Sequence, residues 1–148
     1  MNKREQLTEA LKQALRDRDE TRKRTLRLAL AAIKNAEIDS KSDLDEPEIL
    51  AILQKEVKSR RETIEGAEQA GREDLIVEAL AEIDVLEEFL PEPLGEQELT
   101  ILAQEVIKEV GATTLKDMGK VMQVIIPRVS GRADGKEVSL VVRQLLSK

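Results

Sequence analysis

The side chains of this chain that could do chemistry are its cations and carboxylates, because it contains no histidine and no cysteine. Without histidine the commonest general base and the commonest transition-metal ligand are missing, and without cysteine there is no thiolate nucleophile. These absences exclude zinc hydrolases, Ser-His triads and disulfide or thiol chemistry. We therefore expect no metal site and no cofactor.

The carboxylates and hydroxyls form no recognisable catalytic set. Glu78 and Glu82 are four residues apart, on one helical face, but helical two-metal sites also need a Glu-x-x-His motif. We interpret the pair as a solvated acidic face. The chain contains no G-x-S-x-G elbow, no phosphate-binding P-loop and no dinucleotide fingerprint. We predict no catalytic residue.

The cations are the stronger functional signal, since lysine and arginine supply most of the affinity for nucleic acid through counterion release. The chain has one aromatic residue, Phe89, so it has no side chains to spare for base stacking, and RNA contacts would be to backbone and shape. Arg60 interrupts an apolar stripe, which leaves two interpretations open, a phosphate contact or a paired core arginine. The predicted RNA-binding residues are Arg27, Lys58, Arg61, Arg72, Lys120, Arg128, Arg132 and Lys136.

Charge is distributed unevenly along the chain. Residues 1–36 hold ten Lys/Arg and five Asp/Glu, residues 37–112 hold seven and 22, and residues 113–148 hold seven and three. The basic ends indicate a polyanionic partner, although such blocks more often form a solvated face or pair with each other.

The elements that must position these side chains are helices. Ala, Leu, Glu, Lys and Arg dominate the composition, and apolar residues recur at spacings of three and four. The pattern predicts an all-α protein with a four-helix domain over 1–92 and a three-helix domain over 93–148, divided at the Pro-Glu-Pro-Leu-Gly segment. The expected helices cover about 2–18, 19–38, 46–70, 72–90, 96–110, 114–129 and 136–148.

Gly119 lies inside the sixth expected helix, where glycine costs roughly 1 kcal/mol relative to alanine. Close packing against another helix is the favoured explanation. The alternative is a backbone that approaches a ligand or partner.

Six strings occur in an order and spacing that resemble the YqeY-like family over essentially the whole chain: Thr25-Leu26-Arg27, Lys58-Ser59-Arg60-Arg61-Glu62, Ala70-Gly71-Arg72-Glu73-Asp74-Leu75, Phe89-Leu90-Pro91, Asp117-Met118-Gly119-Lys120-Val121-Met122 and Gly131-Arg132-Ala133-Asp134-Gly135. From about Leu99 onward the chain is also similar to the tail domain of the aspartyl/glutamyl-tRNA amidotransferase B subunit.

This resemblance implies a three-helix module that engages tRNA without catalysing a reaction itself. It carries over Gly119 and Gly131 as close-approach backbone, Lys120 and Arg132 as phosphate contacts, and with them Met122 and Asp134. Gln123 departs from the small residue expected there.

Three hypotheses follow: a non-catalytic tRNA-binding or amidotransferase-associated protein, a protein–protein interaction module without nucleic acid, and a carbon-nitrogen ligase with glutamine as amido donor within an amidotransferase complex. The expected partners are tRNA, amidotransferase subunits or another protein. No apolar run is long enough for a membrane span, and the N-terminus shows no signal or transit pattern, so we expect a cytoplasmic protein.

Overall fold

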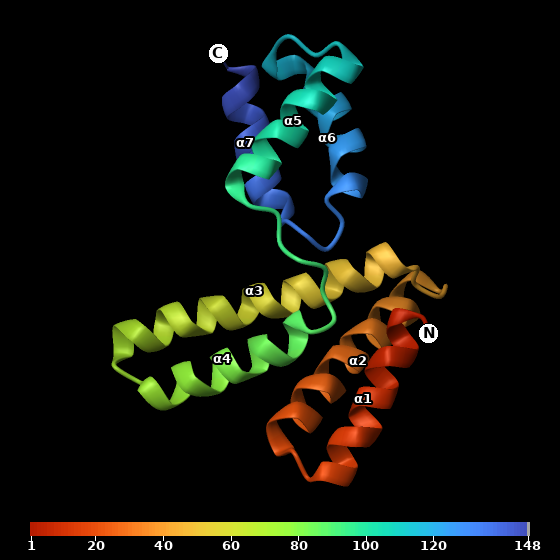
Figure 1. The fold of residues 1–148 in the computed structure, drawn as a ribbon, viewed down its shortest axis with the longest axis vertical. Helices are drawn as coiled ribbons and strands as arrows, with labels where there is room; N and C mark the ends of the chain where they lie inside the picture. The colour runs from red at the N-terminus through yellow and green to blue at the C-terminus, as the bar shows by residue number, and fades with distance from the viewer. Residues whose placement is uncertain (148) are drawn as a thin grey trace. The chain divides into compact units, whose positions relative to one another are not determined.

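The computed structural model describes residues 1–147, and all of its regular elements are helices, which confirms the all-α prediction (Figure 1). Residues 1–147 contain no strand. The predicted sixth helix starts as a separate 3-10 turn. The elements are α1 (Lys3–Asp17), α2 (Glu20–Ser40), α3 (Glu46–Ala70), α4 (Glu73–Glu87), α5 (Glu96–Val110), the 3-10 turn η1 (Leu115–Asp117), α6 (Met118–Arg128) and α7 (Gly135–Leu146).

Contacts divide the chain into two compact units, Met1–Pro91 and a second that starts at Glu92. Helices α1–α4 belong to the first unit, and α5, η1, α6 and α7 belong to the second. That each unit folds as an autonomous domain stays a prediction. No helix among the described residues is long and apolar enough to cross a bilayer.

Local signals set the helix ends. The side chains of Asn2, Asp19 and Asp45 accept hydrogen bonds from the backbone amides of the first turns of α1, α2 and α3. Asp45 and Glu48 form the reciprocal capping box, which satisfies two amides that the helix leaves unpaired. Gly71 ends α3 and Gly111 ends α5 with left-handed backbone, a conformation that glycine adopts without strain.

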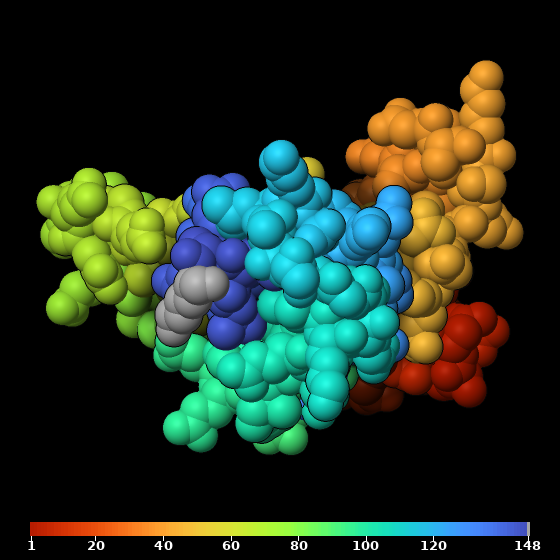
Figure 2. Space-filling model, turned by 90° about the horizontal axis from the view of Figure 1, so that it is seen from above, coloured from red at the N-terminus to blue at the C-terminus, as the bar shows by residue number. Residues whose placement is uncertain are grey.

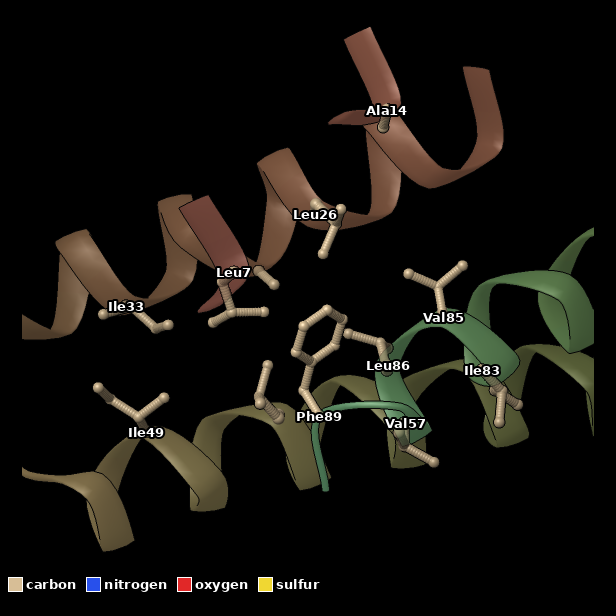
Figure 3. Close-up of a cluster of buried hydrophobic side chains, with 12 residues drawn as sticks. Leu7, Ala14, Leu26, Ile33, Ile49, Val57, Ile83, Val85, Leu86 and Phe89 are labelled. Atoms are coloured by element: carbon tan, nitrogen blue, oxygen red, sulfur yellow. The ribbon is translucent and has the colours of Figure 1, made fainter. Parts of the chain in front are cut away.

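The first unit is built from two helical hairpins, α1–α2 and α3–α4, around one apolar core. Figure 3 shows Leu7, Leu26 and Leu86 converging on Phe89, the one aromatic ring of the chain. Leu7, Leu26 and Leu86 are fully buried. Truncating such a leucine to alanine costs about 2–5 kcal/mol, so this cluster holds the two hairpins together.

The second unit packs three helices around a core of small and branched side chains. Val106 of α5, Val121 and Ile125 of α6, and Val138 and Val142 of α7 are fully buried. In the space-filling view the teal to blue side chains of these helices form one continuous cluster (Figure 2). The basic residues of the C-terminal part are therefore carried by three helices that share a well-packed apolar core.

Candidate functional site

The start of α6 is organised by Asp117. Its Oδ2 accepts hydrogen bonds from the backbone amides of Thr113, at 2.9 Å, and Thr114, at 3.3 Å. These two bonds lower the pKa of the Asp117 carboxyl, and the nearby charge of Lys120 lowers it further. Asp117 is therefore held as an anion that fixes the turn leading into the helix.

Gly119 and Lys120 occupy the first turn of α6, and both are exposed. A β-carbon added at Gly119 would meet no non-neighbouring atom within 4 Å. The predicted close packing of Gly119 against another helix is therefore wrong, because nothing packs there. Lys120 forms no ion pair within 4 Å among the described residues, although it contributes to the field at Asp117. Packing of the fold therefore explains neither the glycine at 119 nor the lysine at 120.

Arg128 lies at the opposite end of α6, eight residues and about 12 Å of helix from Lys120. Its two terminal nitrogens donate to the two carboxylate oxygens of Glu109 on α5, at 3.0 and 2.6 Å. This fork-to-fork pairing raises the pKa of Arg128 and lowers that of Glu109. Arg128 would have to exchange this carboxylate for a phosphate before it could bind RNA.

The Gly131–Gly135 string builds the connection between α6 and α7. Gly131 is buried with a φ of 76°, in the left-handed region that favours glycine. Arg132 donates from Nε to the carbonyl of Glu92, at 2.9 Å, and its own carbonyl accepts from the Leu94 amide, at 2.9 Å. Asp134 caps α7. This string ties the beginning of the second unit to the α6–α7 turn.

Lys136 is exposed in the first turn of α7, beyond this connection. The tail cations therefore do not form one cluster, because Lys120 is separated from the other three by the length of α6. The string resemblance gave their order along the chain. The resemblance could not predict how far apart these cations lie on the surface of the helix bundle.

The cations predicted in the first unit are spread over three elements. Arg72 donates from Nε and a terminal nitrogen to Asp74, at 3.1 and 3.0 Å, which raises the pKa of Arg72 and lowers that of Asp74. Arg61 lies 3.6 Å from the Glu87 carboxylate. Arg27 on α2 and Lys58 on α3 are exposed. Much of the basic character is thus directed at carboxylates of the same chain.

Arg60 resolves the alternative left open by the sequence. Its side chain is 11% exposed, its Nε donates to Glu82 at 2.7 Å, and a terminal nitrogen donates to the Glu56 carbonyl at 3.0 Å. It is a paired, largely buried arginine. Glu82 is only 14% exposed, so the interpretation of Glu78 and Glu82 as a solvated acidic face is wrong for Glu82. Arg24 of α2 also contacts both carboxylates.

Arg60 and Glu82 also line an open groove of about 380 Å³ between α2, α3 and α4. Its apolar walls are Leu28 of α2 and Leu75 and Ala79 of α4. Ser59, Arg60 and Thr63 of α3 and Glu82 of α4 also line it. The sequence gave no sign of this groove, because its lining comes from three helices and extends along the chain from Leu28 to Glu82.

The described residues offer little to a metal or to acid–base chemistry. No group of three or more carboxylates among residues 1–147 could hold a metal ion. Each resolved pKa shift, on Arg4, Glu37, Arg72, Asp74, Glu109, Asp117 and Arg128, favours the charged form.

Several curated proteins similar to this chain carry the name altered inheritance of mitochondria protein 41, mitochondrial. The Eremothecium gossypii protein is 39% identical over 57% of this chain and 46% of its own length. The Pyrenophora tritici-repentis protein is 29% identical over 92% of the chain and 76% of its own length. The Kluyveromyces lactis protein is 39% identical over 56% and 45%. The chain therefore matches about half the length of two of these relatives.

The prediction of a cytoplasmic protein is contradicted by these names, which assign the relatives to the mitochondrion. The prediction depended on signals that the first residues lack. The absence of a recognisable targeting signal does not identify a compartment, so it was not sufficient ground for assigning one.

A family model described as Yqey-like protein matches residues 4–146, nearly the whole chain. The match covers both helical units and all six strings on which the sequence resemblance was based. The chain belongs to the YqeY-like family.

Proposed function

We propose that this protein is a non-catalytic tRNA-binding module that works with a tRNA-dependent amidotransferase and contacts RNA through the start of α6. The observation that carries the proposal is the exposed pair Gly119–Lys120, which the fold does not require. The same pair lies in the string that is similar to the amidotransferase B-subunit tail, where the tail is thought to engage tRNA.

The physical argument starts from the cost of the glycine. An exposed glycine in a helical stretch is roughly 1 kcal/mol less favourable than alanine, and here no steric clash offsets that cost. The absence of a side chain leaves backbone that a ribose-phosphate chain can approach closely. Lys120 then adds a point charge next to this bare backbone, as phosphate recognition requires.

Lys136 and Arg27 support the proposal less directly. Both are exposed and could contact phosphates without giving up an ion pair within the described chain. Arg61, Arg72, Arg128 and Arg132 would each first have to leave a carboxylate. Carbon-nitrogen ligase chemistry with glutamine as amido donor would come from other subunits of an amidotransferase complex.

The test is binding of the full chain to bulk tRNA by fluorescence anisotropy across a salt series. We expect log affinity to fall linearly with log salt, and Lys120→Ala to reduce that slope by about one. Lys108→Ala is the matched control, since Lys108 is an exposed lysine on α5 of the same unit. No binding at low salt, or an equal loss in both variants, would reject the proposal.

A second pair of variants tests the backbone contact. Gly66 of α3 is also an exposed helical glycine with open space around it. Gly119→Gln and Gly66→Gln should each stabilise the fold by about 0.5 kcal/mol, because glutamine is the better helix former. Only Gly119→Gln should weaken tRNA binding. Unchanged tRNA affinity in Gly119→Gln would show that the backbone there is not approached.

A further inference from the structure

The groove between α2, α3 and α4 combines apolar walls with an anionic rim. Leu28 is 49% exposed and Leu75 is 37% exposed, so both walls present accessible aliphatic surface. Glu56, Glu78 and Glu82 contribute three carboxylates to the lining, and Arg60 contributes the one cation. The groove therefore offers burial to aliphatic carbon and an excess of negative charge to whatever binds there.

The single cation of the lining does not cancel this charge at the surface. The Arg60 side chain is largely buried and is committed to Glu82 and to the Glu56 carbonyl. Glu78 is the opposite case, since its side chain is 48% exposed while one oxygen accepts from Arg24. With Arg24 included, the three carboxylates face two guanidiniums, so the groove keeps a net negative charge and Glu78 is its most exposed carboxylate.

The ion pairs within the fold show that these carboxylates bind the cationic ends of arginine side chains. The guanidinium of Arg24 reaches across from α2 to Glu78 and Glu82 of α4, and Arg60 meets Glu82 from α3. Two arginines from different helices already converge on one side of the groove. A side chain with a long aliphatic stem and a cationic head fits such a surface, because the stem covers apolar walls while the head stays at the wet rim.

We infer that this groove is a docking site for a basic, amphipathic segment of a partner protein, with leucine-like side chains between Leu28 and Leu75 and a lysine or arginine at Glu78. The inference concerns the first unit and does not depend on tRNA binding by the second. The first unit holds 16 Lys/Arg and 22 Asp/Glu over residues 1–91, so its overall charge also favours a basic partner.

The test is an NMR titration of the full, isotope-labelled chain with a short amphipathic peptide made of leucine and lysine. We expect saturable shifts of the Ser59, Thr63 and Ala79 amides, which line the groove. Peptides with glutamate in place of lysine, or serine in place of leucine, should lose this response. Shifts spread over acidic surfaces elsewhere, such as the α5 side chain Glu105, would overturn the inference.

Two double variants provide the matched comparison. Leu75→Ser with Glu78→Lys should weaken peptide binding about tenfold or more, a change of about 1.4 kcal/mol. Val77→Ser with Asp84→Lys makes comparable changes, apolar to serine and acid to lysine, on exposed positions of α4 outside the groove and should leave binding unchanged. Equal losses would show non-specific attraction. If tRNA shifts the groove amides instead, the groove belongs to a nucleic-acid surface and the inference fails.

Discussion

Single residues at the ends of the chain's hairpins hold it together through charge, and Glu37 is the clearest case. Its carboxylate accepts from two nitrogens of Arg4 on α1, one of them at 2.8 Å, and from the Leu44 amide at 3.0 Å. The Arg4 hydrogen bond, then the Leu44 bond, lowers the pKa of Glu37 below its ordinary value of 4.5. One side chain thus joins α1, α2 and the loop before α3.

The lowered pKa of Glu37 predicts acid-sensitive stability. Because the folded state binds the proton more weakly than the unfolded state, the contribution of Glu37 is complete above its unfolded pKa and is lost as pH falls through the folded pKa. Glu37→Gln should therefore flatten the decline of unfolding free energy below about pH 4.5. Urea unfolding across pH measures this, and an Arg4→Met variant that leaves the Glu37 titration unchanged would contradict the assigned cause.

Ion-pair partners are what the sequence could not predict at this scale. The cations Arg61, Arg128 and the others were identifiable by type, but whether a carboxylate faces each of them depends on the tertiary fold. Arg128 meets Glu109, 19 residues away, and Arg22 meets Glu88, 66 residues away. The predicted helix packing at Gly119 was wrong for the same reason, since only the packed structure shows that no other part of the chain covers this residue.

Among the elements, the helices were predictable because their signals are local. The Asp45–Glu48 capping box and the Gly71 end of α3 depend on residues within a few positions of each other. The α6–α7 connection is different. There the turn depends on Gly131, and its contacts reach back to Glu92 and Leu94, which no local pattern indicates.

The α6–α7 connection gives a prediction of its own. Gly131→Ala should destabilise the second unit by about 1–2 kcal/mol, because a β-carbon strains the left-handed conformation at φ 76°. Thermal or urea unfolding would show the loss. Gly135→Ala is the control, since Gly135 lies in the first turn of α7 and an added β-carbon meets only Ile126 at an ordinary 3.9 Å. Equal loss in both variants would argue against backbone strain.

For the whole molecule, the division of the chain into two compact units predicts two domains that fold separately. Each has its own apolar core. We expect fragments 1–91 and 92–148 each to retain helical circular dichroism and to unfold cooperatively. The second fragment has fewer than about 60 residues, so it should be the less stable. An unstructured second fragment would show that it depends on the first.

The charge of the units differs as well. Residues 1–91 hold 16 Lys/Arg and 22 Asp/Glu, whereas residues 92–148 hold eight of each. A polyanion is therefore repelled by the first unit and not by the second, so under the proposed function we expect RNA to bind to the second unit.

That Phe89 is the one aromatic ring in the first core has a practical consequence for any complex. With a single phenylalanine and no tryptophan or tyrosine in the sequence, the chain has almost no near-ultraviolet signal of its own. Tryptophan emission from a mixture with a protein partner would come from the partner alone. Binding of a tryptophan-containing partner protein can therefore be followed by the partner's own fluorescence, without labelling.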